Sequence, residues 1–329
     1  MRTTLFGGHA LRAASITALA AALAAPALAA DDPAPRKLDI LLSNDDGIGA
    51  PNLLALAEAL RKAGHRVAVA APCHDASGSG ALVHLLRPLG PIEKDCRGGK
   101  VKVGAPGYGP VDAAEPSVHY VDGSPLMAGI YGMQVLAQQQ WQKAPDLVIS
   151  GPNEGNNTGL VGPSSGTLAV ATHALQRRIP AIAISADRNT RKDPASSAAV
   201  AALMVPLIDK LVAGDEALPD SVGLNINLPP LTDTPPAVAL SRVGRGTKYF
   251  GVFAPDISED PVGKMFKLST HAAAFSIRPF KPTAEDEEEA VIGTGRIAIS
   301  FIQGGYDADA DNSAGIAAWR KRLARVLPH

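Results

Sequence analysis

Two adjacent carboxylates, Asp45 and Asp46, follow the short apolar run Leu38–Leu42 and precede Gly47. Consecutive residues of a strand point to opposite faces, so these carboxylates could not share a ligand if the strand simply continued. Gly47 allows the backbone to turn, which would let both side chains face one point. Neighbouring carboxylates repel each other unless a cation lies between them, and an oxygen-only set favours a hard ion such as Mg²⁺ or Mn²⁺. The alternative is a helix-capping Asp beside a solvent-exposed one, because Asp is common in turns.

Two further apolar runs end in polar loops. The loop Pro72–Gly80 is rich in Gly and Ser, and its hydroxyls and backbone N–H groups could approach a ligand, although ordinary turns have the same composition. The segment Gly151–Gly159 holds more amides and glycines than a turn needs, which favours a ligand site.

The stretch Ser165–Thr167 leads directly into an apolar helix expected at Leu168–Gln176. Small and hydroxyl residues at a helix N-terminus are typical of phosphate sites, where free N–H groups and the positive end of the helix dipole face the anion. The same residue types also serve as ordinary N-caps. Both interpretations remain open for this stretch taken alone.

The elements that would position these residues alternate between strand and helix. Strands are expected at 38–42, 66–71, 146–150, 181–185 and 222–227, with a short one at 100–103, and helices at 53–62, 127–140, 168–176 and 196–212. This alternation predicts a right-handed, doubly wound, mostly parallel α/β sheet. Such sheets bind ligands at the carboxyl ends of their strands, where the polar loops would lie.

After residue 228 the pattern changes to short β-like runs at 237–241, 248–252 and 297–302, which predicts a β-rich arm. The acidic run Glu285–Glu289 is most simply a solvated surface. An amphipathic helix is expected at Ser313–Val326, with its apolar residues on one face. We therefore expect an α/β core at 31–228, followed by the arm and a terminal helix at 229–329.

The N-terminus predicts export. Residues 1–30 combine a basic start, an apolar small-residue segment and a cleavage site before Asp31, as in a secretory signal peptide, so we expect a periplasmic or secreted protein without stable membrane association. Subtracting the two basic residues of this segment from 31 leaves 29 basic against 32 acidic residues, a net charge of −3. This charge does not suit a nucleic-acid-binding surface. Cys73 and Cys96 could form a disulfide in an oxidising compartment, or remain as two free thiols.

Taken together, the motifs resemble those of the SurE family of phosphatases and nucleotidases. The similarity lies in Ile40–Gly47, Asp146–Gly159, Ser165–Thr167, Leu224–Pro229 and Arg242–Arg245, and it covers most of residues 38 to 302. It implies a Rossmann-like core and a divalent-metal-dependent phosphomonoesterase acting on nucleoside monophosphates. It also implies a homodimer or homotetramer built through the C-terminal arm.

The resemblance assigns roles residue by residue. It implies metal ligands at Asp45, Asp46, Ser77 and Asn153, catalytic roles for Asp45, Asp46 and Asn44, and phosphate binding by Asn157, Ser165, Gly166 and Thr167. The nucleophile could be Asp45 or a water on the metal. His74, close to the site in sequence, could protonate the leaving group.

Two departures from the family pattern concern substrate preference and assembly more than chemistry. Met127 stands where an Asp is usual, and Val262 replaces the first Arg of a D-P-R-G-R motif. A periplasmic solute-binding protein is the alternative from another functional class, since it shares the signal peptide, the size and the α/β pattern. It would need two similar lobes, whereas this chain shows one α/β half followed by a β-rich segment.

Overall fold

The computed structural model describes residues 36–212 and 221–305. The expected signal peptide (1–30) and the expected C-terminal helix (Ser313–Val326) lie outside the described residues.

A central nine-stranded sheet has the order β3-β4-β2-β1-β5-β6-β7-β11-β8. Its parallel block comprises β1 (Asp39–Ser43), β2 (Arg66–Pro72), β4 (Val118–Val121), β5 (Leu147–Glu154), β6 (Ala181–Ala186) and β7 (Val222–Asn227). The strands β3 (Tyr108–Pro110) and β11 (Ile297–Gln303) run antiparallel to β4 and β7, and β8 (Val238–Ser241) pairs parallel with β11. The predicted Rossmann-like, mostly parallel fold is confirmed.

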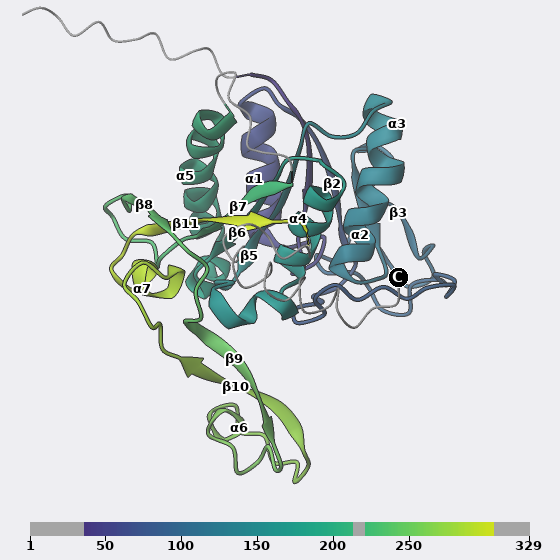
Figure 1. Cartoon of the computed structure of the whole chain (residues 1–329). Coiled ribbons are helices and arrows are strands. Elements are labelled where there is room, and N and C mark those ends of the chain that lie inside the picture. The colour runs from purple at the N-terminus through teal and green to yellow at the C-terminus, as the bar shows by residue number, and fades with distance from the viewer. Residues whose placement is uncertain (1–35, 213–220, 306–329) are drawn as a thin grey trace, which may run out of the picture. The chain divides into compact units, whose positions relative to one another are not determined.

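Helices cover both faces of this sheet (Figure 1). One layer contains α1 (Pro51–Lys62) and α5 (Pro194–Val212), and the other contains α2 (Pro125–Tyr131), the π-helix η1 (Gly132–Leu136), α3 (Ala137–Trp141) and α4 (Gly166–Gln176). Side chains of β1 alternate between the layers, so Ile40 and Leu42 pack with the first and Leu41 with the second. All three are fully buried, which explains why β1 appears in the sequence as an almost unbroken apolar run.

The helix α5 is also long and apolar enough to pass a length-and-composition test for a membrane span. Its residues Val200, Met204 and Ile208 are fully buried in the core that it shares with α1.

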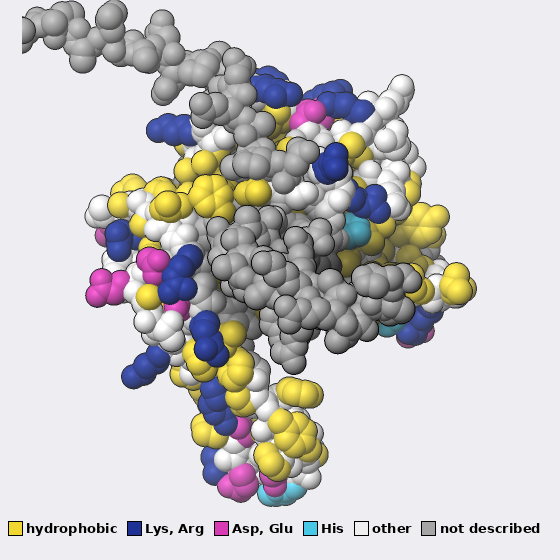
Figure 2. All heavy atoms as spheres, viewed as in Figure 1, with side chains coloured by type: hydrophobic (Ala, Val, Ile, Leu, Met, Phe, Trp, Pro, Cys, Tyr) yellow, Lys and Arg dark blue, Asp and Glu magenta, His cyan; other side chains and the backbone are white. Residues whose placement is uncertain are grey.

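The segment after β7 divides between the central sheet and a separate hairpin. Strands β8 and β11 extend the central sheet, whereas β9 (Thr247–Ala254) and β10 (Ala274–Phe280) form an antiparallel two-stranded sheet of their own. The predicted boundary at residue 228 therefore does not coincide with the change from one sheet to the other. Hydrophobic side chains gather on this hairpin (Figure 2), where Phe253 and Phe275 are 63% and 83% exposed. The short helices are η2 (Gly159–Ser164), η3 (Arg188–Lys192), α6 (Pro261–Met265) and α7 (Glu288–Gly293).

Two expectations about local structure are wrong. Residues 100–103 form turns rather than a strand, because the backbone of this Gly-rich loop bonds locally, as in Cys96 N–H to Val101 O (3.0 Å). The acidic run 285–289 is not simply a solvated surface, since Glu287 and Glu288 are fully buried. Glu287 accepts hydrogen bonds from the N–H groups of Arg245 and Gly246, both at 2.8 Å. Burial raises the pKa of Glu287, but these bonds and those from Thr283 outweigh it and lower the pKa to about 2.

Cys73 and Cys96 form a disulfide, with an S–S distance of 2.01 Å. This decides between the two alternatives that the sequence left open. The bond links Cys73, directly after β2, to Cys96, which lies 23 residues further along the chain in a loop. The next residue, Arg97, donates its backbone N–H to the Cys73 carbonyl (2.9 Å), so the loop runs against the carboxyl edge of the sheet.

Candidate active site

The predicted site residues meet where the winding of the sheet reverses. From β1 the chain passes through α1 to β2 on one side, whereas β5, which pairs with β1 on its other side, leads on to β6 and β7. In open α/β sheets the crevice at such a switch point, at the carboxyl ends of the strands, is where ligands bind. Asp45 and Asp46 follow β1 after the single residue Asn44, and Asn153 lies near the end of β5.

The turn after β1 depends on Gly47. Its φ of +103° is a conformation that favours glycine, and a Cβ there would lie 2.9 Å from the carbonyl carbon of His74. Asn44 closes the same turn, because its side chain donates to the Gly47 carbonyl (3.2 Å) and accepts from the Gly47 N–H (3.3 Å). Asn44 is fully buried and is not among the described residues that line the cavity. The structure thus places Asn44 behind the site as a residue that shapes the turn, which does not support the catalytic role that the resemblance implied.

A cavity of about 440 Å³ opens at this edge of the sheet, and all four predicted metal ligands line it: Asp45, Asp46, Ser77 and Asn153. The cavity walls come from the ends of β1, β2 and β5, the loop before α4, η3 and the β9–β10 hairpin. Ser77 is exposed, and its N–H donates to the carboxylate of Asp75 (2.9 Å).

Burial dominates the electrostatics of the two aspartates. Asp45 accepts a hydrogen bond from the Thr167 hydroxyl (3.1 Å), but burial and the nearby charge of Asp75 raise its pKa to about 6. Asp46 accepts from the backbone N–H of Glu154 (3.0 Å), and burial, then Asp45, then Glu154 raise its pKa well above the ordinary value. A cation between the two carboxylates would reverse both shifts, because it favours their charged forms.

Asn153 carries a further oxygen that such a cation could bind. Its amide nitrogen donates to the Gly155 carbonyl (2.6 Å), while its oxygen Oδ1 is buried without a hydrogen-bond partner among the described residues. A buried polar atom without a partner is costly, and in a native protein it calls for an explanation such as an ion. Two carboxylates and an amide oxygen without a partner fit a hard divalent cation.

The residues expected to bind phosphate fall into two groups. Asn157 and Ser165 line the cavity, and the Ser165 hydroxyl caps α4 by accepting from Leu168 N–H (3.1 Å). Within the described chain, Gly166 and Thr167 are not part of the cavity wall. A Cβ at Gly166 would lie 2.7 Å from the Asp45 Cβ, so these two residues pack against Asp45 and hold it.

Several residues at the site escaped the sequence analysis. Arg97 donates to the Asp46 carbonyl (2.7 Å) and to both carboxylate oxygens of Glu154 (2.9 and 3.0 Å). Arg188 and Tyr249 line the cavity, and the guanidinium of Arg188 lies 5.9 Å from the ring centre of Tyr249, which comes from the hairpin. The one sequence signal that Arg97 lies near the site was its position directly after Cys96, and this signal could be used only once the disulfide to Cys73 was known.

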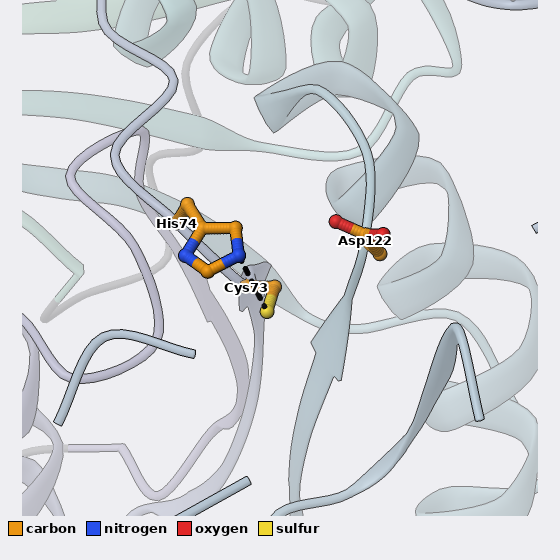
Figure 3. A group of neighbouring side chains, drawn as sticks. All are labelled: Cys73, His74 and Asp122. Carbon is orange, nitrogen blue, oxygen red and sulfur yellow. Dashed lines mark hydrogen bonds between the residues drawn. The ribbon is translucent and has the colours of Figure 1, made fainter. Parts of the chain in front are cut away.

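Cys73, His74 and Asp122 lie close together (Figure 3) and would pass as a metal site by spacing alone. Cys73 cannot serve as a thiolate ligand, because its sulfur is bonded to Cys96. The His74 ring instead contacts that sulfur, with Nε2 at 3.4 Å (Figure 3). His74 is not among the described residues that line the cavity, so its geometry gives no support to the role of a proton donor.

Comparison with known proteins agrees with this geometry. Residues 40–249 match the family model for the survival protein SurE. An acid phosphatase from Yarrowia lipolytica is 32% identical over 61% of this chain, and a 5'-nucleotidase SurE from Methanocella arvoryzae is 30% identical over 74% of it. The alignments span 59% of the first protein and 91% of the second.

A solved structure is similar as well. The crystal structure of the SurE protein from Aquifex aeolicus superimposes with a TM-score of 0.61, at 25% identity, over 82% of this chain and 94% of that protein. The family model alone covers more than half of the sequence, and the solved structure has the same sheet architecture. The chain therefore belongs to the SurE family.

Proposed function

We propose that this protein is a divalent-metal-dependent phosphomonoesterase that hydrolyses nucleoside monophosphates to nucleoside and phosphate. The observation that carries the proposal is the buried Asn153 Oδ1, which has no partner among the described residues and belongs to a side chain that lines one cavity with Asp45 and Asp46. The relatives named acid phosphatase and 5'-nucleotidase support the reaction class, and they do not favour a solute-binding protein.

Asp45, Asp46, Ser77 and Asn153 would hold the cation, which we propose to be Mg²⁺ or Mn²⁺. When bound, the cation supplies a Lewis acid that neutralises phosphoryl charge and acidifies water. The protein contributes position and charge. Thr167 and Gly166 fix Asp45, while the Asn157 and Ser165 side chains in the cavity wall orient the phosphate.

Asn157 is well placed for this task because its surroundings hold it rigidly. Its backbone N–H donates to Asn227 Oδ1 (2.9 Å), and Asn225 and Asn227 donate to its carbonyl (3.1 and 3.2 Å). Its own amide nitrogen donates to Ser185 (3.0 Å) and to Thr167 (3.3 Å). A site whose groups are fixed in advance loses little free energy in reorganising when the phosphate binds.

The test is release of inorganic phosphate from a panel of nucleoside monophosphates and p-nitrophenyl phosphate, in EDTA and after addition of Mn²⁺ or Mg²⁺. We expect activity that disappears with EDTA, returns with metal and is abolished in Asp46→Asn. The exposed loop variant Asp233→Asn is the matched control and should keep full activity. No phosphate release with any metal, or near-normal activity of Asp46→Asn, would refute the proposal.

We further propose a homodimer or homotetramer assembled through the β9–β10 hairpin, supported by its exposed aromatic residues Phe253 and Phe275. Light scattering after gel filtration should show the oligomer, and Phe275→Ser should shift it toward the monomer.

We also propose a periplasmic or secreted location. The Cys73–Cys96 disulfide supports it, because such bonds persist in oxidising compartments. Cell fractionation should recover a mature chain that begins near Asp31.

A further inference from the structure

Arg97 occupies a position directly behind the proposed metal site. Its guanidinium bonds to the Asp46 carbonyl and to both carboxylate oxygens of Glu154. Glu154 is the residue after Asn153, and its own backbone N–H donates to Asp46 Oδ2 (3.0 Å). Arg97 therefore contacts the backbone of one proposed ligand and the side chain of the residue that adjoins another.

Arg97 is also anchored. It follows Cys96 in the disulfide, and its N–H bonds to the Cys73 carbonyl (2.9 Å). Its backbone packs so closely on Gly49 that a Cβ there would lie 2.3 Å from the Arg97 carbonyl oxygen. These contacts hold the guanidinium in place even though its side chain is 30% exposed.

The Glu154 carboxylate needs this partner. Its side chain is only 3% exposed, and it lies beside the buried Asp46. A buried carboxylate that loses its counter-ion is strongly destabilising, and unless it takes up a proton it moves toward water or toward another cation. Either movement would displace the peptide that joins Asn153 to Glu154, and with it the N–H that orients Asp46 and the amide that supplies Oδ1.

We propose that Arg97, anchored by the Cys73–Cys96 disulfide, is a positioning residue that holds Glu154 and thereby keeps Asp46 and Asn153 in the geometry that binds the divalent cation. It does not line the cavity among the described residues, so it acts through these neighbours. The inference rests on the proposed metal site.

The experiment measures the dissociation constant for Mn²⁺ by isothermal titration calorimetry on full-length mature protein, with the melting temperature recorded in EDTA. Arg97→Gln should weaken Mn²⁺ binding roughly tenfold or more, as loss of an outer contact to a metal ligand does. Arg97→Gln combined with Glu154→Gln should recover most of the affinity, because no buried charge is then left without a partner. Arg97→Lys should lie between, since a single ammonium nitrogen cannot occupy the positions of both Nη1, which bonds the Asp46 carbonyl, and Nη2, which bonds Glu154.

Arg61→Gln is the matched control. Arg61 pairs with Glu115 at 3.0 Å, is 32% exposed and also bonds a backbone carbonyl, that of Val67 (3.2 Å), but it lies away from the cavity. The Arg61→Gln variant should have a lower melting temperature than the wild type but the same affinity for Mn²⁺. If Arg97→Gln does not fold, Cys96→Ser takes its place, because it releases the anchor and leaves the guanidinium intact.

The outcomes separate two failures. Wild-type protein that binds no Mn²⁺ would overturn the metal site and this inference together. Wild-type binding with unchanged or tighter Mn²⁺ affinity in Arg97→Gln would overturn only the role of Arg97, since loss of a positive charge alone would favour the cation. Failure of the double variant to recover affinity would overturn the role of Glu154 as the group that Arg97 holds.

Discussion

Replacing Asp45 by Asn should make the metal-free protein more stable at neutral pH. Asp45 is buried, and its pKa of about 6 in the folded protein compares with an ordinary value of 3.8. Each unit of pKa corresponds to about 1.36 kcal/mol, so the ionised carboxylate costs the folded state about 3 kcal/mol. Asn keeps the size of the side chain and an oxygen to accept the hydrogen bond from Thr167, but it carries no charge.

The sign follows from proton binding. Because the folded state has the higher pKa, it binds the Asp45 proton more tightly than the unfolded state does. The stability from this group is therefore fully present below pH 3.8 and is lost as the pH rises through about 6. The gain in unfolding free energy of Asp45→Asn over the wild type should therefore be complete above about pH 7 and small at about pH 4.

The assay is thermal unfolding followed by circular dichroism in EDTA at pH 7.5 and pH 4. For a domain of this size about 3 kcal/mol corresponds to a rise in melting temperature of roughly 6 °C. Mn²⁺ at 100 times its dissociation constant should stabilise the wild type by about 2.7 kcal/mol and the variant hardly at all. The stability difference between the two proteins should therefore narrow or reverse when metal is added. Asp233→Asn, at an exposed position that is not among the described residues lining the cavity, is the control for a change of charge without burial.

Two results would refute the reasoning. One is an Asp45→Asn protein that is less stable than wild type in EDTA at pH 7.5. The other is a stability difference of equal size at pH 7.5 and pH 4, because a cost that comes from ionisation must depend on pH.

Three further predictions follow from the same contacts. Asn153→Ala should weaken Mn²⁺ binding by about tenfold or more, about 1.4 kcal/mol, in calorimetric titration; unchanged affinity would remove Asn153 from the ligand set. Gly166→Ala should displace Asp45, destabilise the fold by about 1 to 3 kcal/mol and abolish phosphatase activity, whereas Gly251→Ala should fold normally because a Cβ there would face open space. Equal stability of the two variants in urea unfolding would contradict the close packing at Gly166. Glu287→Gln should lower the unfolding free energy by about 2 kcal/mol in urea at pH 7, because stability from a carboxylate whose pKa is lowered to about 2 is present above its ordinary pKa of 4.5 and is lost as the pH falls through about 2. A loss of stability that persists undiminished at pH 2 would show that the ionised Glu287 carboxylate is not its cause.

Local patterns in the sequence were enough to predict most of the sheet. The apolar runs that became β1, β5 and β6 are buried on both faces, and a strand in that environment has few alternatives to a continuous apolar sequence. The meeting of Asp45, Asp46 and Asn153 followed as well, because the carboxyl ends of neighbouring parallel strands lie at one edge of the sheet.

Contacts between distant parts of the chain decided the rest. Arg97 reaches Glu154 across 57 positions, and Glu287 reaches Gly246 across 41, so no local pattern could show that either carboxylate is buried. The same holds for Thr167, whose hydroxyl suits a phosphate as well as it suits Asp45 and meets the carboxylate 122 positions away. A polar side chain in sequence states only which bonds it can make. Which bond it does make is decided by the partner that the folded chain brings within about 3 Å, because a buried polar group without a partner is costly.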